Sequence, residues 1–279
     1  MISLCFRRSL VFKEFSEINI AEKTHNQFIK KYLSEKTFFY NATDATKIPL
    51  REKAIKVEKV KLKPKKRGRP KKGEIREPIK PTILKQQKNM RSIDEKLLLI
   101  STDCGVGVKQ NSKGNREVWI GGKLHISVVD GDIPITAFYS GANVHDSSVA
   151  LPLIQETSSR VQYLYDLQDA GYDADIIREY STTLGHRPII DINPKNSKEL
   201  KAKIELIKHE KRVFNDLNQY LNLDTEHYKQ RSMVERVNKY LKDDFGCNKI
   251  YYQGAKKVAS VLAFGILSIC IHQSLKLVT

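Results

Sequence analysis

Two β-rich runs joined by a tight turn constrain the fold of this chain more than any other feature. The segment REVWIGGKLHISVVDGDIPITAFYSGAN, residues 116–143, places β-branched and aromatic residues on both sides of Asp-Gly-Asp. Asp and Gly tolerate the backbone conformations that a hairpin turn requires, so the pattern predicts an antiparallel hairpin.

Helices and strands are expected to alternate around this hairpin. HDSSVALPLIQE predicts a helix with Asp146 as its N-cap, and RVQYLYDLQDAGYDADIIREY predicts a strand at about 161–167, a turn and a helix. HRPIIDINP predicts a short strand, and a long charged helix is expected over residues 196–221. Upstream, residues 4–35 have helical spacing, and TFFYNATDATKIPL, residues 37–50, begins as a strand that we expect to end near Asp44. The order favours an α/β fold, a mixed sheet flanked by helices.

A strongly basic segment interrupts this pattern. Residues 51–80 hold 14 Lys and Arg against 4 Asp and Glu, so +10 of the formal charge of +17 lies in this stretch. Pro and Gly in KPKKRGRPKKGE oppose a helix, and like charges resist compaction, which predicts a disordered basic insertion. The expected organisation is an N-terminal helical segment (1–36), a first catalytic strand (37–50), a flexible insertion (51–96) and the remainder of the domain (97–279).

The overall composition indicates the compartment and the kind of partner. A net charge of +17 favours a polyanionic partner, because cationic side chains neutralise phosphates and release counterions. Cys5, Cys104, Cys247 and Cys270 form no CxxC pair and are typical of reduced intracellular thiols. The run VASVLAFGILSICI is too short to span a bilayer comfortably, so we expect a buried helix, no membrane association and a cytoplasmic protein.

Acidic residues stand where strands are expected to end. Asp44 falls at the end of the first strand and Asp169 just past a later one, and ligand groups gather at the carboxyl ends of strands in open α/β sheets. Taken singly, each is more typical of a cap or a turn. In YKQRSMVERVNKYLK, four residues project from one face of a predicted helix: Tyr228, Arg231, Glu235 and Lys242. The simpler interpretation of this face is a solvated surface with Arg231 and Glu235 as an i,i+4 pair.

The same stretch fits Y-x2-R-x3-E-x6-K, and the chain from about residue 35 onward resembles bacterial insertion-sequence DDE transposases that carry this signature. DATKIPLREK resembles the first-aspartate segment of that family, DAGYDA the second, and ERVNKYLKDDFG one of its C-terminal helices. The segment that ends in NVHDS resembles its central strands.

The resemblance implies a ribonuclease-H-like catalytic domain that cleaves DNA at the ends of a mobile element and transfers the strands. It implies Asp44, Asp169 and Glu235 as catalytic residues and as ligands of two Mg²⁺ or Mn²⁺ ions, which take oxygen ligands. It also implies that Tyr228, Arg231 and Lys242 assist binding of double-stranded DNA by a protein that acts as a homodimer.

Several alternatives stay open at the level of sequence. Asp103 is the rival to Asp44 as first aspartate, although similar family members carry an acid at the position of Gly105. That difference and the short segment before the first strand point to an N-terminally short copy, and a decayed, inactive DNA-binding remnant is one alternative to an active enzyme. A nuclease of the same fold that cuts branched DNA is another. In the basic insertion KRGRPKK resembles an AT-hook, in which Arg67, Gly68, Arg69 and Pro70 would grip a narrow minor groove.

Overall fold

The fold was examined in a computed structural model that describes residues 11–55, 81–110, 114–194, 197–199, 201–206, 209, 223–248 and 250–277. The AT-hook-like residues and most of the long charged segment at 196–221 lie outside these described residues.

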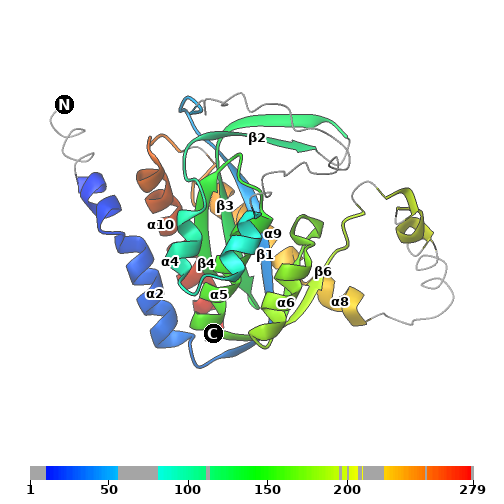
Figure 1. Ribbon diagram of the computed structural model, residues 1–279. Helices are drawn as coiled ribbons and strands as arrows, with labels where there is room; N and C mark the ends of the chain where they lie inside the picture. Colours follow the sequence, from blue (N-terminus) through cyan, green and yellow to red (C-terminus); the bar gives the residue numbers. More distant parts are fainter. Residues whose placement is uncertain are drawn as a thin grey trace.

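A six-stranded mixed sheet forms the centre of the molecule (Figure 1). The strands are β1 (Thr37–Pro49), β2 (Gly105–Gln110), β3 (Arg116–Val129), β4 (Ile133–Gly141), β5 (Gln162–Gln168) and β6 (Arg187–Ile190). Their order is β2-β3-β1-β5-β6, and β4 pairs with β3. β1, β3 and β4 pair antiparallel, whereas β5 and β6 run parallel to β1. This topology is that of a ribonuclease-H-like fold, as the sequence predicted.

Strand β3 has two halves with different neighbours. Its second half pairs with β4 and β1. Its first half pairs with β2, from Val106 opposite Ile120 to Gln110 opposite Arg116. The β2–β3 ribbon therefore projects past the body of the sheet (Figure 1). The predicted hairpin is confirmed as β3, a turn at residues 130–132, and β4.

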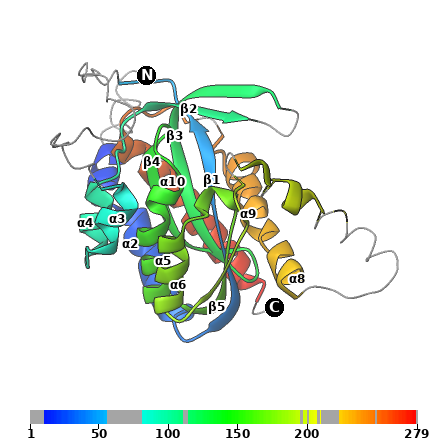
Figure 2. The same ribbon diagram turned by 45° about the vertical axis from the view of Figure 1, so that its right-hand side comes forward.

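Helices cover both faces of the sheet. α5 (Ser147–Arg160) and α6 (Asp175–Thr183) lie in front of it in Figure 2, with α3 (Ile83–Lys88) and α4 (Ile93–Leu98) packed beside α5. α2 (Ile20–Tyr32), α9 (Ser232–Asp243) and α10 (Ala255–Leu275) cover the other face. The remaining elements are η1 (Ala170–Tyr172) and α8 (Leu223–Lys229).

The largest hydrophobic core lies between the sheet and helices α9 and α10. Alternate residues of β1 and β3, including Ala42, Ile48, Leu124 and Ile126, meet apolar side chains of both helices there. By length and composition α10 is also long enough to cross a membrane, but it packs against β4, α2 and α9. The prediction of a buried core helix at this position therefore holds, although the helix is 21 residues long.

Three local features differ from the sequence-based expectations. β1 continues to Pro49 instead of ending near Asp44, because β3 offers a backbone partner as far as Gly121. Asn19, at φ 50°, separates a first helical stretch at residues 11–17 from α2. The basic segment expected to be flexible up to residue 96 already contains α3 and the start of α4, because Thr82 and Ser92 cap these helices.

Candidate active site

The candidate site lies at the edge of β1 that β5 leaves free. β5 pairs with β1 only as far as Thr43 opposite Gln168, so β1 has a single neighbour from Asp44 onward. Asp169 is the residue directly after the last paired position of β5. A cavity of about 500 Å³ opens there, and Asp44 and Asp169 both line it. Asp44 therefore lies in the middle of β1 but beside the carboxyl end of β5.

Asp44 is a half-buried carboxylate on the face of the sheet that α9 covers. The side-chain amide of Asn238 on α9 lies 3.4 Å from its Oδ2 and donates a hydrogen bond. Burial raises the pKa of Asp44 to about 6, and the negative charge of Asp169 adds to the rise. Two carboxylates that share one polar cavity in this way favour a bound cation, which would offset their mutual repulsion.

Asp169 is fixed by the turn that follows β5. It is the N-cap of η1, and its Oδ1 accepts a 2.8 Å hydrogen bond from the backbone N–H of Gly171. A side chain at position 171 would place its Cβ 2.9 Å from that oxygen. The cap role considered from the sequence is therefore real, and it also orients the carboxylate at the cavity.

Arg231 connects the third acid to the other two. Its Nη2 lies 2.6 Å from Oε1 of Glu235, the i,i+4 pair considered as the simpler interpretation. Burial lowers the pKa of Arg231, but the charges of Tyr228, Asp44, Glu235 and Asp169 outweigh it and raise the pKa. The charges of all three acids therefore act on the guanidinium group, but neither Arg231 nor Glu235 lines the cavity that holds Asp44 and Asp169.

The other two signature residues lie at opposite ends of this arrangement. The ring of Tyr228 lies under the guanidinium of Arg231, with 5.8 Å from Cζ to the ring centroid, and burial beside Asp191 raises the pKa of its hydroxyl. Lys242 lines the cavity and donates a hydrogen bond to Oγ1 of Thr46. Of the four signature residues, only Lys242 lines the cavity. The charge of Asp169 acts on Tyr228 and Arg231, and Glu235 is linked to the site through Arg231.

One prediction about this stretch is wrong: the four residues do not share one regular helix. Tyr228 belongs to α8, Arg231 is the N-cap of α9, and only Glu235 and Lys242 lie within α9. Between the helices, backbone hydrogen bonds join Arg231 to Tyr228 and Met233 to Gln230, each three residues apart. This tighter turn interrupts the α-helical spacing.

Asp103 lies elsewhere. It is exposed in the bend before β2, its backbone N–H donates to Ser101, and it does not line the cavity that holds Asp44 and Asp169. The structure brings Asp44, and not Asp103, together with Asp169.

Sequence reasoning missed several residues of this cavity. Asp146 stands at the predicted N-cap position of α5, but its side chain makes no capping hydrogen bond. Its carboxylate instead lines the cavity and forms a 2.8 Å ion pair with Lys123 of β3. Lys47 and Lys109 line the cavity as well. Their alternation along predicted strands carried the only signal, and it showed neither which face they occupy nor what lies opposite.

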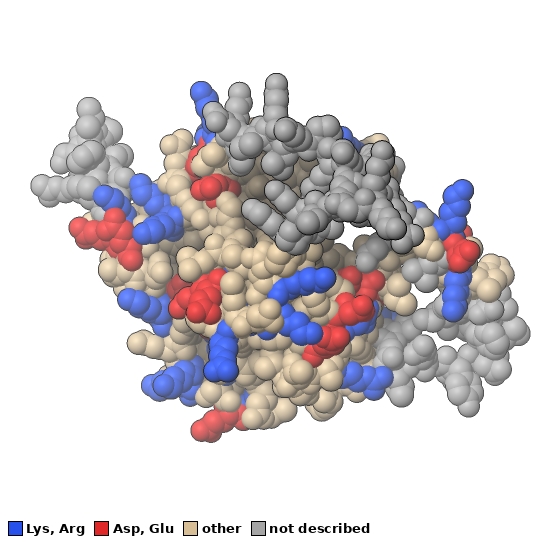
Figure 3. All heavy atoms as spheres, in the orientation of Figure 1, with Lys and Arg blue, Asp and Glu red and all other residues tan. Residues whose placement is uncertain are grey.

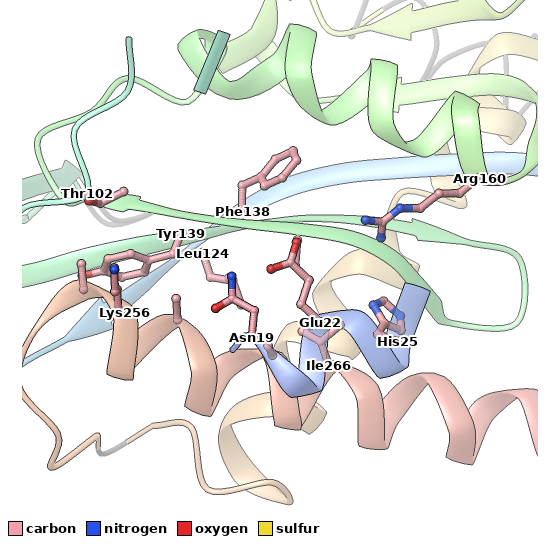
Figure 4. Close-up of a pocket in the computed structure, with 14 residues that line it drawn as sticks. Asn19, Glu22, His25, Thr102, Leu124, Phe138, Tyr139, Arg160, Lys256 and Ile266 are labelled. Carbon is pink, nitrogen blue, oxygen red and sulfur yellow. The ribbon is translucent and has the colours of Figure 1, made fainter. Parts of the chain in front are cut away.

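A second cavity, of about 250 Å³, lies between α2, the sheet and α10 (Figure 4). It contains Glu22, His25, Arg160 and Lys256, but neither Asp44 nor Asp169. Burial and the nearby Arg160 lower the pKa of His25 to about 4, and its ring nitrogen is 3.0 Å from the carbonyl of Pro134. A neutral histidine held by a backbone carbonyl is a structural residue, so this cavity is no rival as an active site.

The three acids fit a hard divalent cation in their chemistry, because carboxylate oxygens are the ligands that Mg²⁺ and Mn²⁺ prefer. Within the part of the chain that the structure describes, no three His, Cys, Asp or Glu side chains lie close enough to hold one ion. Asp44 and Asp169 line the same cavity, whereas Glu235 does not line it and is paired with Arg231.

Fold and site together define a ribonuclease-H-like α/β protein of the kind that acts on nucleic-acid backbones. A family model described as the transposase DDE domain matches residues 42–271, and the chain belongs to that family. No curated protein and no solved structure matches the chain.

Proposed function

We propose that this protein is an active DDE transposase that cleaves DNA at insertion-sequence ends and joins the freed strands to target DNA. The observation that carries the proposal is that Asp44 and Asp169 line one cavity, while the charges of these two acids and of Glu235 all act on Arg231. Asp44 and Asp169 are 125 positions apart in the chain and Glu235 lies 66 positions further on, so the tertiary fold sets their grouping.

Asp44, Asp169 and Glu235 would hold the divalent ions, two Mg²⁺ or Mn²⁺. When bound, such ions lower the pKa of a water nucleophile and stabilise the leaving oxygen. For Glu235 to contribute, its carboxylate must exchange Arg231 for the cation. The exposed fraction of its side chain is 57%, so this rotation meets little resistance.

The cationic residues of the site would bind the DNA backbone. Arg231, once released from Glu235, presents a planar guanidinium that suits a phosphate, and Lys242 adds a point charge. Tyr228 positions Arg231 through their ring contact. Arg67, Gly68, Arg69 and Pro70 would add a minor-groove contact with little sequence specificity. We infer that double-stranded DNA is the partner, that a homodimer pairs two element ends, and that the protein acts on chromosomal DNA in the cytoplasm.

The test is a cleavage assay on DNA carrying the sequences that flank the gene, with Mg²⁺ or Mn²⁺. Glu235→Gln keeps the size of the side chain and removes its charge, so we expect DNA binding to persist and cleavage to fall at least about 100-fold, as for loss of an electrostatic catalytic group. Glu226→Gln is the matched control, because Glu226 pairs with Lys229 on α8 and does not line the cavity. Unchanged cleavage by Glu235→Gln would contradict the proposal.

A second candidate function is an inactive DNA-binding remnant. The ion pair between Arg231 and Glu235 favours it, because the third acid is neutralised in the structure. In that case the wild-type protein binds DNA but shows no saturable binding of Mn²⁺ at the site, and Asp169→Asn changes neither property. Metal binding that depends on Asp169 excludes the remnant.

A further inference from the structure

Lysine side chains surround the two acids of the candidate site. Lys47 of β1, Lys109 of β2, Lys123 of β3 and Lys242 of α9 all line the same cavity. On the described part of the face shown in Figure 3, basic and acidic residues are interspersed and form no broad basic patch. The concentration of four ammonium groups in one cavity is therefore a distinct feature.

Two of these lysines already have a carboxylate partner. Lys123 lies 2.8 Å from Oδ1 of Asp146 and also donates to the carbonyl of Val144, so its charge is compensated. Lys47 forms an ion pair with Glu117, and the exposed fractions of the two side chains are 37% and 47%. An ion pair this exposed contributes little stability and exchanges readily.

The other two lysines form no ion pair with any residue that the structure describes. Lys109 is exposed near the end of β2, where it lies opposite Glu117 of β3 in the ribbon register. Lys242 is half-buried, and burial followed by the charges of Lys47 and Lys109 lowers its pKa. The ammonium groups of Lys47, Lys109 and Lys242 therefore repel one another in the free protein. An anion bound among them would reduce that repulsion.

A DNA backbone phosphate is an anion that suits this cavity. The three amines come from two strands and one helix that line it, and an ammonium group is a compact point charge that binds phosphate. Asp44 and Asp169 exclude a second anion from their own part of the cavity.

We propose that Lys47, Lys109 and Lys242 form a phosphate clamp that holds a DNA backbone phosphate next to the bond to be cleaved, with Glu117 as the anion that occupies the clamp in the free protein. The inference rests on the proposed function, because it assigns the neighbouring phosphate of the same DNA strand. Glu117 and DNA compete for Lys47, so removal of the Glu117 charge strengthens DNA binding. If the Lys47–Glu117 pair is purely structural, removal of the Glu117 charge should instead weaken DNA binding.

The test measures DNA affinity at several salt concentrations in EDTA, with a short random-sequence duplex and four proteins: wild type, Lys109→Ala, Glu117→Gln and Lys30→Ala. Lys30 is an exposed lysine of α2, remote from the cavity, and is the matched control. Loss of one phosphate contact lowers the slope of log K against log salt by about 0.9. We expect this change for Lys109→Ala and no change for Lys30→Ala. For Glu117→Gln we expect tighter binding, by about 1.4- to fivefold, the range that an exposed ion pair spans.

Identical slopes for Lys109→Ala and Lys30→Ala would overturn the clamp, and so would weaker binding by Glu117→Gln. Inorganic phosphate serves as a competitor in a separate arm: if the clamp holds a DNA phosphate, millimolar phosphate should weaken DNA binding more in wild type than in Lys109→Ala, and equal weakening in the two proteins would contradict the clamp. The binding measurements are made without metal, so they remain valid even if the protein does not cleave DNA. If cleavage is normal and the salt slopes are unchanged, the clamp is wrong but the proposed function stands. Thermal unfolding of each variant verifies that the ribbon still folds.

Discussion

Replacement of Arg231 by glutamine should have opposite effects on metal binding and on DNA binding. The Arg231 guanidinium pairs with Glu235 and interacts with Asp44 and Asp169, so it is the internal counterion of the acids. A divalent ion must displace it from Glu235. Without the guanidinium, the acids are free for the ion, but the DNA loses a phosphate ligand.

The size of the effect follows from the exposure of the pair. The exposed fraction is 20% for the Arg231 side chain and 57% for Glu235, and an ion pair this accessible is worth about 0.2–1 kcal/mol. At about 1.4 kcal/mol per factor of ten, the affinity of the DNA-free protein for Mn²⁺ should rise by about 1.4- to fivefold. Removal of the positive charge near Asp44 and Asp169 acts in the same direction.

The assay is calorimetric titration of DNA-free protein with Mn²⁺ for wild type, Arg231→Gln and Arg236→Gln. Arg236 lies on the same helix but pairs with Asp132, and its Nη2 is 2.6 Å from Oδ1, so it controls for loss of a helix-surface arginine. DNA binding by Arg231→Gln should weaken in parallel. Mn²⁺ binding that is unchanged or weaker in Arg231→Gln would refute the reasoning, because the guanidinium would then not compete with the metal for these acids.

Two further predictions concern a buried residue of β5 and the turn that follows this strand. Burial raises the pKa of Asp166 to about 6 from an ordinary value of 3.8, against hydrogen bonds from Ser181, Asn41 and Gln168 that lower it. The folded state therefore holds this proton more tightly, so stability is full below pH 3.8 and declines by about 3 kcal/mol as pH rises through 6. The Asp166→Asn variant cannot ionise at this position. The difference in unfolding free energy between wild type and Asp166→Asn, measured in urea from pH 4 to 7, should therefore shift by that amount. A difference that does not depend on pH would contradict this prediction. Gly171→Ala would bring a Cβ within 2.9 Å of Asp169 Oδ1, so we expect the carboxylate to move and cleavage to fall about 10- to 100-fold at normal DNA affinity; wild-type cleavage by this variant would show that the position of Asp169 is not critical.

The elements of the fold could be predicted where a single pattern covers the whole element. The hairpin around Gly131, the strand before Asp169 and the apolar C-terminal helix were all recognisable, because alternation, turn residues and an apolar run are local properties. The end of β1 was not, because its last residues are held by β3, about 75 positions away, as the pairing of Pro49 with Gly121 shows. The break between α8 and α9 was also hidden, since each residue there is compatible with a helix.

By itself the sequence determined the α/β class, the family and three acids as candidates for the site. Only the tertiary structure decided that Asp44 meets Asp169, because that contact depends on β5 ending one residue before Asp169 while β1 continues. It also decided that Arg231 neutralises Glu235 and that four lysines surround the acids. Strand register and strand length set these contacts, and both arise from pairing between segments that no local pattern of residues can specify.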